Sequence, residues 1–171
     1  LVIAPDSSSN DYEAHEYLSK NGIDVLVIDH HEAEKVSEYA CVINNQLCDY
    51  PTKSLSGAGM VYKLCQYIDK IMGAEYAPQF LDLVATALVA DMMDLRTFET
   101  KHLVQQGLKN VVNPYFKGMT IKNEYSLGGK VTPFGVAFYI APYVNAVTRS
   151  GTMEEKIVLF ESMLDFKAFE S

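Results

Sequence analysis

Long apolar runs, paired cysteines and an excess of basic residues are all missing from this sequence. No apolar run reaches the roughly 18 residues that a membrane-spanning helix needs, so we expect no membrane partner. The three cysteines, Cys41, Cys48 and Cys65, are odd in number and lack Cys-x-x-Cys spacing. This excludes a disulfide framework and a cysteine-based zinc site, and it indicates reduced thiols in a cytoplasmic protein.

Positive charge is also scarce. The chain has 14 lysine and arginine residues against 22 aspartate and glutamate residues, which gives a formal net charge of -8. That balance argues against binding nucleic acid through bulk surface electrostatics. It leaves room for a local basic groove, and a cluster of metal-binding carboxylates would itself lower the net charge. Because 49% of the residues are hydrophobic and the charges are dispersed, the composition is typical of a globular domain.

Strand patterns begin at the first residue. Residues 1–5 (Leu-Val-Ile-Ala-Pro) and 24–28 (Asp-Val-Leu-Val-Ile) read as buried strands. A helix between them, capped by Ser9 or Asn10 and ended by Gly22, completes a strand–helix–strand unit. Such a unit predicts parallel strands. Because the chain opens inside a buried-strand pattern, we expect it to be a fragment of a longer protein.

The remaining chain predicts one more strand, at residues 41–43, and then mainly helices. Helical spacing and capping residues indicate five helices, at residues 57–72, 78–95, 98–112, 132–142 and 153–166. Ser56 and Gly73 bracket the first of these, and Thr152 with Glu155 forms a capping box for the last. Residues 117–130 are polar and read as a loop.

Polar groups that can bind a metal follow both front strands. Asp6 comes directly after the first strand, and Asp29, His30 and His31 come at the end of the second. Since ligands of parallel sheets collect at the carboxyl ends of the strands, these groups share one edge of the predicted sheet. Carboxylate and imidazole ligands together suit manganese, iron or zinc better than calcium. The alternative is that Asp6 opens an Asx-type turn and the histidines are ordinary loop residues.

Asp91 lies in an apolar stretch that predicts a helix buried on most of its faces. An unpaired carboxylate there would cost several kcal/mol of desolvation. A metal ion bound to Asp91 would offset this desolvation cost. One alternative is that an ion pair with Arg96 or Lys101 offsets it. Another is that Asp91 lies on an exposed stripe of the helix together with Asp82 and Asp94.

Five segments of the chain resemble motifs of the DHH phosphoesterases, especially of the RecJ-like members of that family. They are residues 5–10 (Pro-Asp-Ser-Ser-Ser-Asn), 27–32 (Val-Ile-Asp-His-His-Glu), 55–59 (Leu-Ser-Gly-Ala-Gly), 90–95 (Ala-Asp-Met-Met-Asp-Leu) and 140–149, which ends in Asn-Ala-Val-Thr-Arg. Asp-His-His alone is a weak signal, but five motifs in the family's order are specific. Two parts of the family pattern are absent, namely an acidic motif ahead of residue 1 and a C-terminal nucleic-acid-binding domain. Thr148 also stands where RecJ-like members usually carry glycine.

The resemblance implies phosphodiester hydrolysis at two manganese ions, with magnesium as an alternative. Asp6 would bridge both ions, and His30 and Asp91 would bind one of them. Asp29 would orient His30, and His31 would donate a hydrogen bond to a phosphate oxygen.

The resemblance also implies contacts to the substrate. Arg149 would clamp the phosphate charge, because its planar fork matches phosphate oxygens, and Asn145 lies one helical turn earlier. Ser56, Gly57 and Gly59 would let backbone N–H groups approach an anion at the start of a helix. The plain alternatives are a surface arginine and an ordinary helix entrance.

The expected fold is therefore α/β, a parallel-sheet DHH catalytic domain over residues 1–115 with a helical connector over residues 116–171. The implied function is exonuclease digestion of single-stranded DNA from the 5′ end, in DNA repair or recombination. One alternative is a phosphodiesterase for oligoribonucleotides or cyclic dinucleotides. Another is a degenerate scaffold without catalysis, against which the presence of Asp6, His30 and Asp91 argues.

Overall fold

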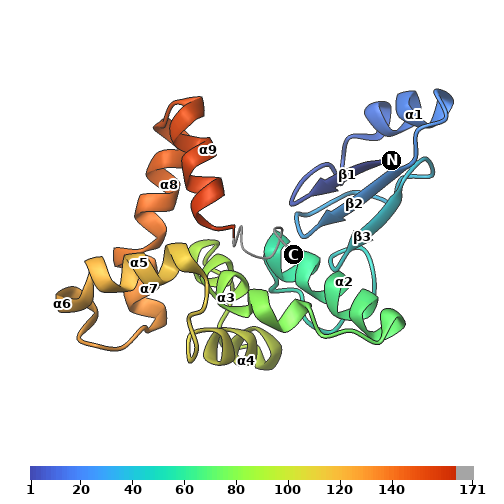
Figure 1. Cartoon of the computed structure of the whole chain (residues 1–171). Coiled ribbons are helices and arrows are strands. Elements are labelled where there is room, and N and C mark those ends of the chain that lie inside the picture. Colours follow the sequence, from blue (N-terminus) through green and yellow to red (C-terminus); the bar gives the residue numbers. More distant parts are fainter. Residues whose placement is uncertain (165–171) are drawn as a thin grey trace.

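Residues 1–164, which the computed structural model describes, form a parallel sheet followed by a series of helices (Figure 1). The strands are β1 (Val2–Pro5), β2 (Val25–Asp29) and β3 (Cys41–Asn44), in the order β1-β2-β3. Both strand pairs are parallel. The predicted α/β class with a parallel sheet is confirmed, and each strand lies within one residue of its predicted position.

Burial differs sharply between the first two strands. In β2, Val25, Val27 and Ile28 are all buried, as predicted. The prediction of a buried first strand was wrong, since Leu1 is 79% and Ile3 is 54% exposed. Within the described residues β1 pairs only with β2 and forms an edge of the sheet.

Helix α1 (Tyr12–Lys20) connects β1 to β2 and lies above the sheet in Figure 1. Its N-cap is Asp11, so the prediction that Ser9 or Asn10 caps this helix was wrong. Ser9 is instead buried, and its N–H donates to the carboxylate of Asp29 at the end of β2. Gly22 has a positive φ of 71° just after the helix, which agrees with the predicted stop.

Helix α2 (Gly57–Met72) lies below the sheet in Figure 1 and packs against β1 and β2. The Ser56 hydroxyl accepts a hydrogen bond from the Gly59 N–H, and Gly73 ends the helix in the left-handed conformation. Both predicted signals are confirmed. A short turn, η1 (Ala77–Phe80), then leads into α3 (Leu81–Ala90), which packs on α2, and α4 (Phe98–Gly107), which packs on α3.

Helix α3 ends five residues before its predicted end at residue 95. Met92 adopts a left-handed conformation with φ of 55°. The Met93 N–H donates to the Leu88 carbonyl (3.0 Å) and the Met92 N–H to the Val89 carbonyl (3.1 Å), which is a Schellman stop. This stop usually needs glycine, so a methionine gave no sequence signal for it.

Helix α4 also ends early, at Gly107 rather than at residue 112. The buried carboxylate of Asp82, in α3, accepts the N–H groups of Val112 (2.8 Å) and Asn113 (2.7 Å). These contacts fix the linker after α4 in a non-helical conformation.

The predicted loop at residues 117–130 was wrong. Helices α5 (Pro114–Lys122) and α6 (Glu124–Leu127) occupy most of it. Asn113 caps α5 by accepting the Tyr115 N–H, and Phe116 and Met119 bury one face of the helix. Tertiary packing thus outweighed the polar composition.

Three helices complete the described chain: α7 (Pro133–Tyr139), α8 (Ala141–Ser150) and α9 (Met153–Ser162). Thr132 caps α7, and the capping box of α9 is present, as predicted. Helix α7 ends at Tyr139, before its predicted end at residue 142, and Pro142 lies in the first turn of α8. The predicted end of the last helix at residue 166 lies outside the described residues. None of the helices over residues 1–164 combines the length and apolarity of a membrane span.

Candidate metal centre

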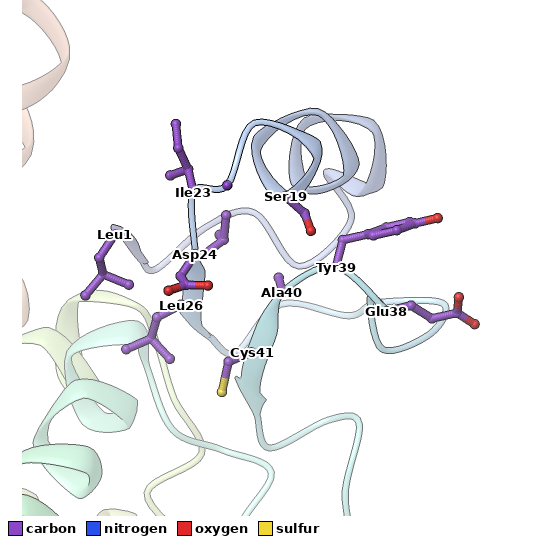
Figure 2. Close-up of a pocket in the computed structure, with 11 residues that line it drawn as sticks. Leu1, Ser19, Ile23, Asp24, Leu26, Glu38, Tyr39, Ala40 and Cys41 are labelled. Atoms are coloured by element: carbon purple, nitrogen blue, oxygen red, sulfur yellow. The ribbon is translucent and has the colours of Figure 1, made fainter.

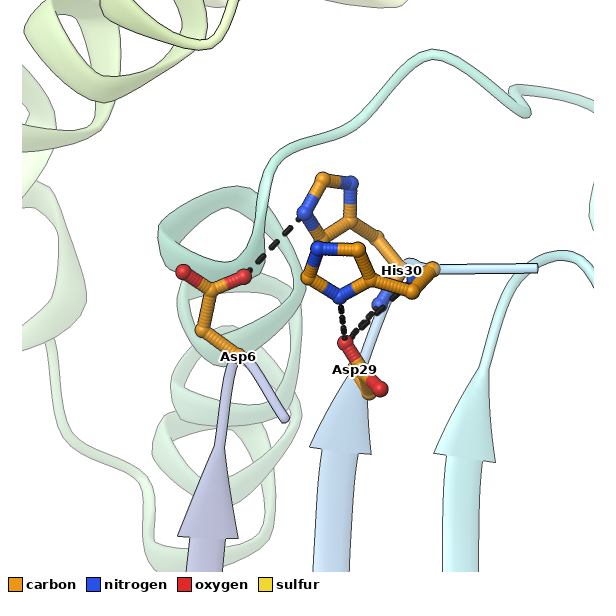
Figure 3. Close-up of side chains that lie close together, drawn as sticks. Asp6, Asp29 and His30 are labelled. Carbon is orange, nitrogen blue, oxygen red and sulfur yellow. Dashed lines mark hydrogen bonds and ion pairs between the residues drawn. The ribbon is translucent and has the colours of Figure 1, made fainter. Parts of the chain in front are cut away.

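Four potential metal ligands meet at the carboxyl ends of β1 and β2 (Figure 3). Asp6, Asp29, His30 and His31 each offer a donor atom, and these atoms lie within 4.8 Å of one another. They come together because β1 and β2 are neighbours in the sheet and Pro5 pairs with Ile28. The predicted clustering of these residues at one sheet edge is therefore seen in the structure.

Asp6 occupies an unusual backbone conformation. Its φ is 57°, and its N–H donates to the Ile28 carbonyl at 2.8 Å. Its carboxylate points at His30, with 3.1 Å between Oδ1 and the His30 Nε2 (Figure 3). A Cβ atom on Gly57 would overlap the Cβ, Cγ and Oδ1 atoms of Asp6. The missing side chain of Gly57 thus makes the room in which this carboxylate sits, at the positive end of α2.

Asp29 is buried and accepts four hydrogen bonds. Its Oδ1 accepts the His30 N–H (2.8 Å) and the His31 N–H (3.3 Å), and it lies 2.7 Å from the His31 Nδ1. Its Oδ2 accepts the Ser9 N–H at 3.2 Å. Burial alone would raise the pKa of Asp29, but hydrogen bonds from the side chains of His31 and Ser9 and from the backbone lower it to about 2.

These contacts change one predicted role. Asp29 was expected to orient His30, but within residues 1–164 the only hydrogen bond between them is from the His30 backbone N–H, and the imidazole partner of Asp29 is His31. The hydrogen bond from Asp29 raises the pKa of His31, although burial opposes the shift, and the charges of Asp29, Asp6 and Asp91 add to it. His31 is thus held by one ring nitrogen, and its side chain is 60% exposed.

Asp91 lies at the C-terminal end of α3, outside the group of four. The prediction that a buried helix encloses it was wrong, because the helix ends at Ala90 and Asp91 is exposed. Desolvation by the surrounding protein nevertheless raises the pKa of Asp91, and repulsion by Asp6 adds to this, while His30 and His31 oppose it. The charges of Asp6, His30 and His31 therefore act on the Asp91 carboxylate.

The two structural alternatives for Asp91 are both contradicted. Arg96 pairs with Asp94, with 2.8 Å between its Nη2 and the Asp94 Oδ2, instead of with Asp91. Asp82 is buried, so it cannot share an exposed stripe. Within residues 1–164 the Asp91 carboxylate has no hydrogen-bond or ion-pair partner.

The donor set fits a transition-metal ion. Imidazole nitrogen and carboxylate oxygen lie 3.1 Å apart in the His30–Asp6 pair, and a third carboxylate, Asp91, is coupled to them by charge. This mixture suits manganese better than calcium. Asp91 is the C-cap of α3, and the negative end of the helix dipole favours a cation near it.

The predicted substrate residues lie in two places. Ser56, Gly57 and Gly59 are buried at the start of α2, next to Asp6, but the Gly59 N–H already donates to Ser56. Asn145 and Arg149 lie one turn apart on α8 and are exposed. In Figure 1 the strand arrowheads point toward the side on which α8 and α9 stand, but α8 packs against α7 and α9, not against the sheet.

A hollow of about 530 Å³ lies at the opposite, amino end of the strands (Figure 2). Leu1, Asp24 and Cys41 line it, and each of them begins or precedes a strand. Ligand sites of parallel sheets lie at the carboxyl edge, so this hollow is not part of the candidate metal centre.

Two further polar residues at this edge, Ser9 and Asn44, were not predicted to lie there. Ser9 was predicted as a helix cap, and Asn44 was not singled out. The Asn44 side chain donates to the Ser9 hydroxyl at 2.8 Å, and both residues are buried. Only the folded arrangement of the three strand ends brings them together.

Comparison with known proteins agrees with this geometry. Residues 1–88 match the model of the DHH family, N-terminal domain. The chain is 45% identical, over 96% of its length, to the SPbeta prophage-derived protein YorK of Bacillus subtilis, a proposed single-strand DNA-specific exonuclease. It is 29% identical, over 93% of its length, to the single-stranded-DNA-specific exonuclease RecJ of Thermus thermophilus.

Solved structures give the same result. The structure of Thermus thermophilus RecJ in complex with Mn²⁺ matches 97% of this chain with a TM-score of 0.81 and 25% identity. A second structure, of exonuclease RecJ bound to manganese, matches 89% of this chain with a TM-score of 0.75 and 27% identity. The chain spans 29% of the length of YorK and 24% of the length of Thermus thermophilus RecJ.

Proposed function

Since this chain belongs to the DHH family, we propose that it forms the metal-binding part of a hydrolase that cleaves phosphodiester bonds in single-stranded DNA. The observation that carries the proposal is the meeting of Asp6 and His30 at the sheet edge, 3.1 Å apart. The solved relatives that match this chain were crystallised with manganese, which supports a divalent cation at this place.

We assign Asp6, His30 and Asp91 as the residues that hold manganese, with magnesium as the alternative ion. We propose that the site holds two ions and that Asp6 would contact both of them. A manganese ion held there supplies Lewis acidity toward a phosphoryl oxygen and toward water. The protein residues keep the ligands in place: Gly57 leaves the space for the Asp6 carboxylate, and the Asp29 carboxylate fixes the backbone of His30.

His31 is assigned to the substrate. Asp29 holds its Nδ1 at 2.7 Å, so Nε2 is the ring nitrogen left to contact a phosphate oxygen. The raised pKa of His31 favours the imidazolium form, whose Nε2–H donates a charge-assisted hydrogen bond. Asp29 also fixes the orientation of the ring, as carboxylates do for functional histidines.

The remaining substrate contacts are assigned to α2 and α8. Gly57 lies at the start of α2, where the first N–H groups of a helix have no intrahelical partner. Arg149 and Asn145 are exposed on α8. In Figure 1 this helix stands on the side toward which the strand arrowheads point. A guanidinium there would neutralise phosphate charge. Digestion from the 5′ end, in cytoplasmic DNA repair or recombination, is the form of the activity that we propose.

The test uses the full-length protein and single-stranded DNA oligonucleotides blocked at either the 5′ or the 3′ end. We expect digestion in Mn²⁺ but not in Ca²⁺, loss of digestion when the 5′ end is blocked, and loss of activity in His30→Ala. Faster cleavage of two- to five-nucleotide RNA or of cyclic dinucleotides would replace the DNA assignment. Binding of DNA without cleavage in any divalent ion would identify a scaffold and refute the enzyme proposal.

A further inference from the structure

Asn44 contributes the third strand end to the candidate metal centre. It is the last residue of β3 and pairs in register with Asp29 of β2. It is 4% exposed, and its amide nitrogen donates both to the Ser9 hydroxyl (2.8 Å) and to the His31 carbonyl (2.9 Å). Its amide oxygen accepts the Gln46 N–H at 2.8 Å. One buried side chain therefore joins the segments that follow all three strands.

The hydrogen bond to Ser9 links Asn44 to Asp29. An amide NH₂ can only donate, so the Ser9 hydroxyl oxygen accepts from Asn44. The N–H of the same Ser9 donates to the Asp29 Oδ2 at 3.2 Å. Asn44 thus holds in place the residue whose backbone N–H holds Asp29.

Two routes lead from Asn44 to His31. One passes through Ser9 and Asp29 to the His31 Nδ1, and the other goes directly to the His31 carbonyl. The two routes hold both the backbone and the imidazole of the same residue. A buried network that is fully satisfied in this way rigidifies the groups at its end.

We propose that Asn44 is a positioning residue for the hydrolytic site, which holds His31 in the orientation that contacts the phosphate. Asn44 acts through Ser9 and Asp29 and binds neither metal nor substrate itself. This inference rests on the proposed function, because it assigns an action to His31 in that reaction. It predicts an effect on turnover rather than on substrate binding.

The test compares Asn44→Ala with Asn45→Ala in the full-length protein. Asn45 is the neighbouring residue, it is equally buried, and its amide donates to the Thr52 carbonyl at 2.9 Å, away from the cluster. Both variants lose a buried amide of the same kind. We expect kcat on single-stranded DNA in Mn²⁺ to fall about 10- to 100-fold in Asn44→Ala with KM little changed, and to stay near wild type in Asn45→Ala.

A second readout does not depend on activity. In the metal-free protein at about pH 9, above the ordinary histidine pKa, the ¹⁵N resonances of His31 should show the Nδ1–H tautomer. Both tautomers should appear in Asn44→Ala, whereas Asn45→Ala should match wild type. Ser9→Ala removes only the hydroxyl that Asn44 holds, and it should give the same shift if Asn44→Ala does not fold.

The outcomes separate this inference from the proposed function. Equal kcat values and equal His31 spectra in the Asn44 and Asn45 variants would overturn the positioning role while leaving the hydrolase intact. An inactive wild type would refute the proposed function, and the tautomer measurement would then still decide whether Asn44 and Ser9 hold His31.

Discussion

Replacing Gly57 with alanine is a sharp test of how the chain positions Asp6. A Cβ atom at residue 57 would overlap the Cβ, Cγ and Oδ1 atoms of Asp6. Rotation of the side chain cannot relieve the overlap with the Asp6 Cβ, so the backbone at residue 6 has to move. That backbone is fixed by the 2.8 Å hydrogen bond from the Asp6 N–H to the Ile28 carbonyl. The substitution should therefore displace a proposed metal ligand.

The expected magnitudes follow from these contacts. Overpacking of this kind costs about 1–3 kcal/mol, and the higher helix propensity of alanine returns up to about 1 kcal/mol, so the net loss of stability should be at most about 3 kcal/mol. Displacing Asp6 should weaken Mn²⁺ binding about 10- to 100-fold, or about 1.4–2.7 kcal/mol of binding free energy. Titration calorimetry with Mn²⁺ and a urea unfolding curve measure the two effects.

Gly59→Ala is the matched control on the same helix. A Cβ atom there would meet the Leu55 Cβ at 3.4 Å and the Leu88 Cδ2 at 3.5 Å, which are ordinary packing distances. Manganese affinity should therefore be unchanged in Gly59→Ala. Wild-type Mn²⁺ affinity in Gly57→Ala would refute the argument that the missing side chain makes room for the Asp6 carboxylate.

Two further predictions concern stability. Met92→Gly should raise the free energy of unfolding by about 0.5–1 kcal/mol in urea titrations, because Met92 is 89% exposed and holds φ of 55°; a loss of stability would contradict this. Glu99 is partly buried, which alone would raise its pKa, but hydrogen bonds from Lys63, Thr52 and Tyr50 lower it below the ordinary value of 4.5. A lowered folded-state pKa contributes stability above the unfolded-state value that is lost as the pH falls through the folded-state value. The free energy of unfolding of Glu99→Gln should therefore be about 1–2 kcal/mol lower than that of wild type at pH 7. This difference should shrink below about pH 4.5. A difference that does not depend on pH would count against the ion pair.

The elements that the sequence predicted correctly are those with local signals. Ser56 and Gly73 bracket α2, and Thr152 with Glu155 begins α9, because caps act within one turn of the chain. The end of α3 escaped prediction because a left-handed methionine at residue 92 has no sequence signature. The exposure of β1 escaped it because the apolar pattern of a strand does not show what covers it.

In the candidate site, too, some features could be predicted from the sequence and others depend on the folded structure. The position of Asp6 and His30 at a common edge followed from the order of the strands. The pairing of Asp29 with His31, and not with His30, depends on side-chain orientation, which spacing does not determine. Asn44 reads as an ordinary strand-end asparagine until its two donated hydrogen bonds are seen. The division into domains at residues 115 and 116 stays a prediction.

The most direct test of the central claim is thermal melting of wild type and Asp91→Ala, with and without Mn²⁺, in the full-length protein. Asp91 is exposed, and its pKa is raised by desolvation and further by repulsion from Asp6. The account predicts that Asp91→Ala keeps or raises the metal-free Tm and loses the increase in Tm that Mn²⁺ gives to wild type. A large drop in the metal-free Tm, with the stabilisation by Mn²⁺ retained, would show that Asp91 is a structural carboxylate and would contradict the metal centre proposed for this chain.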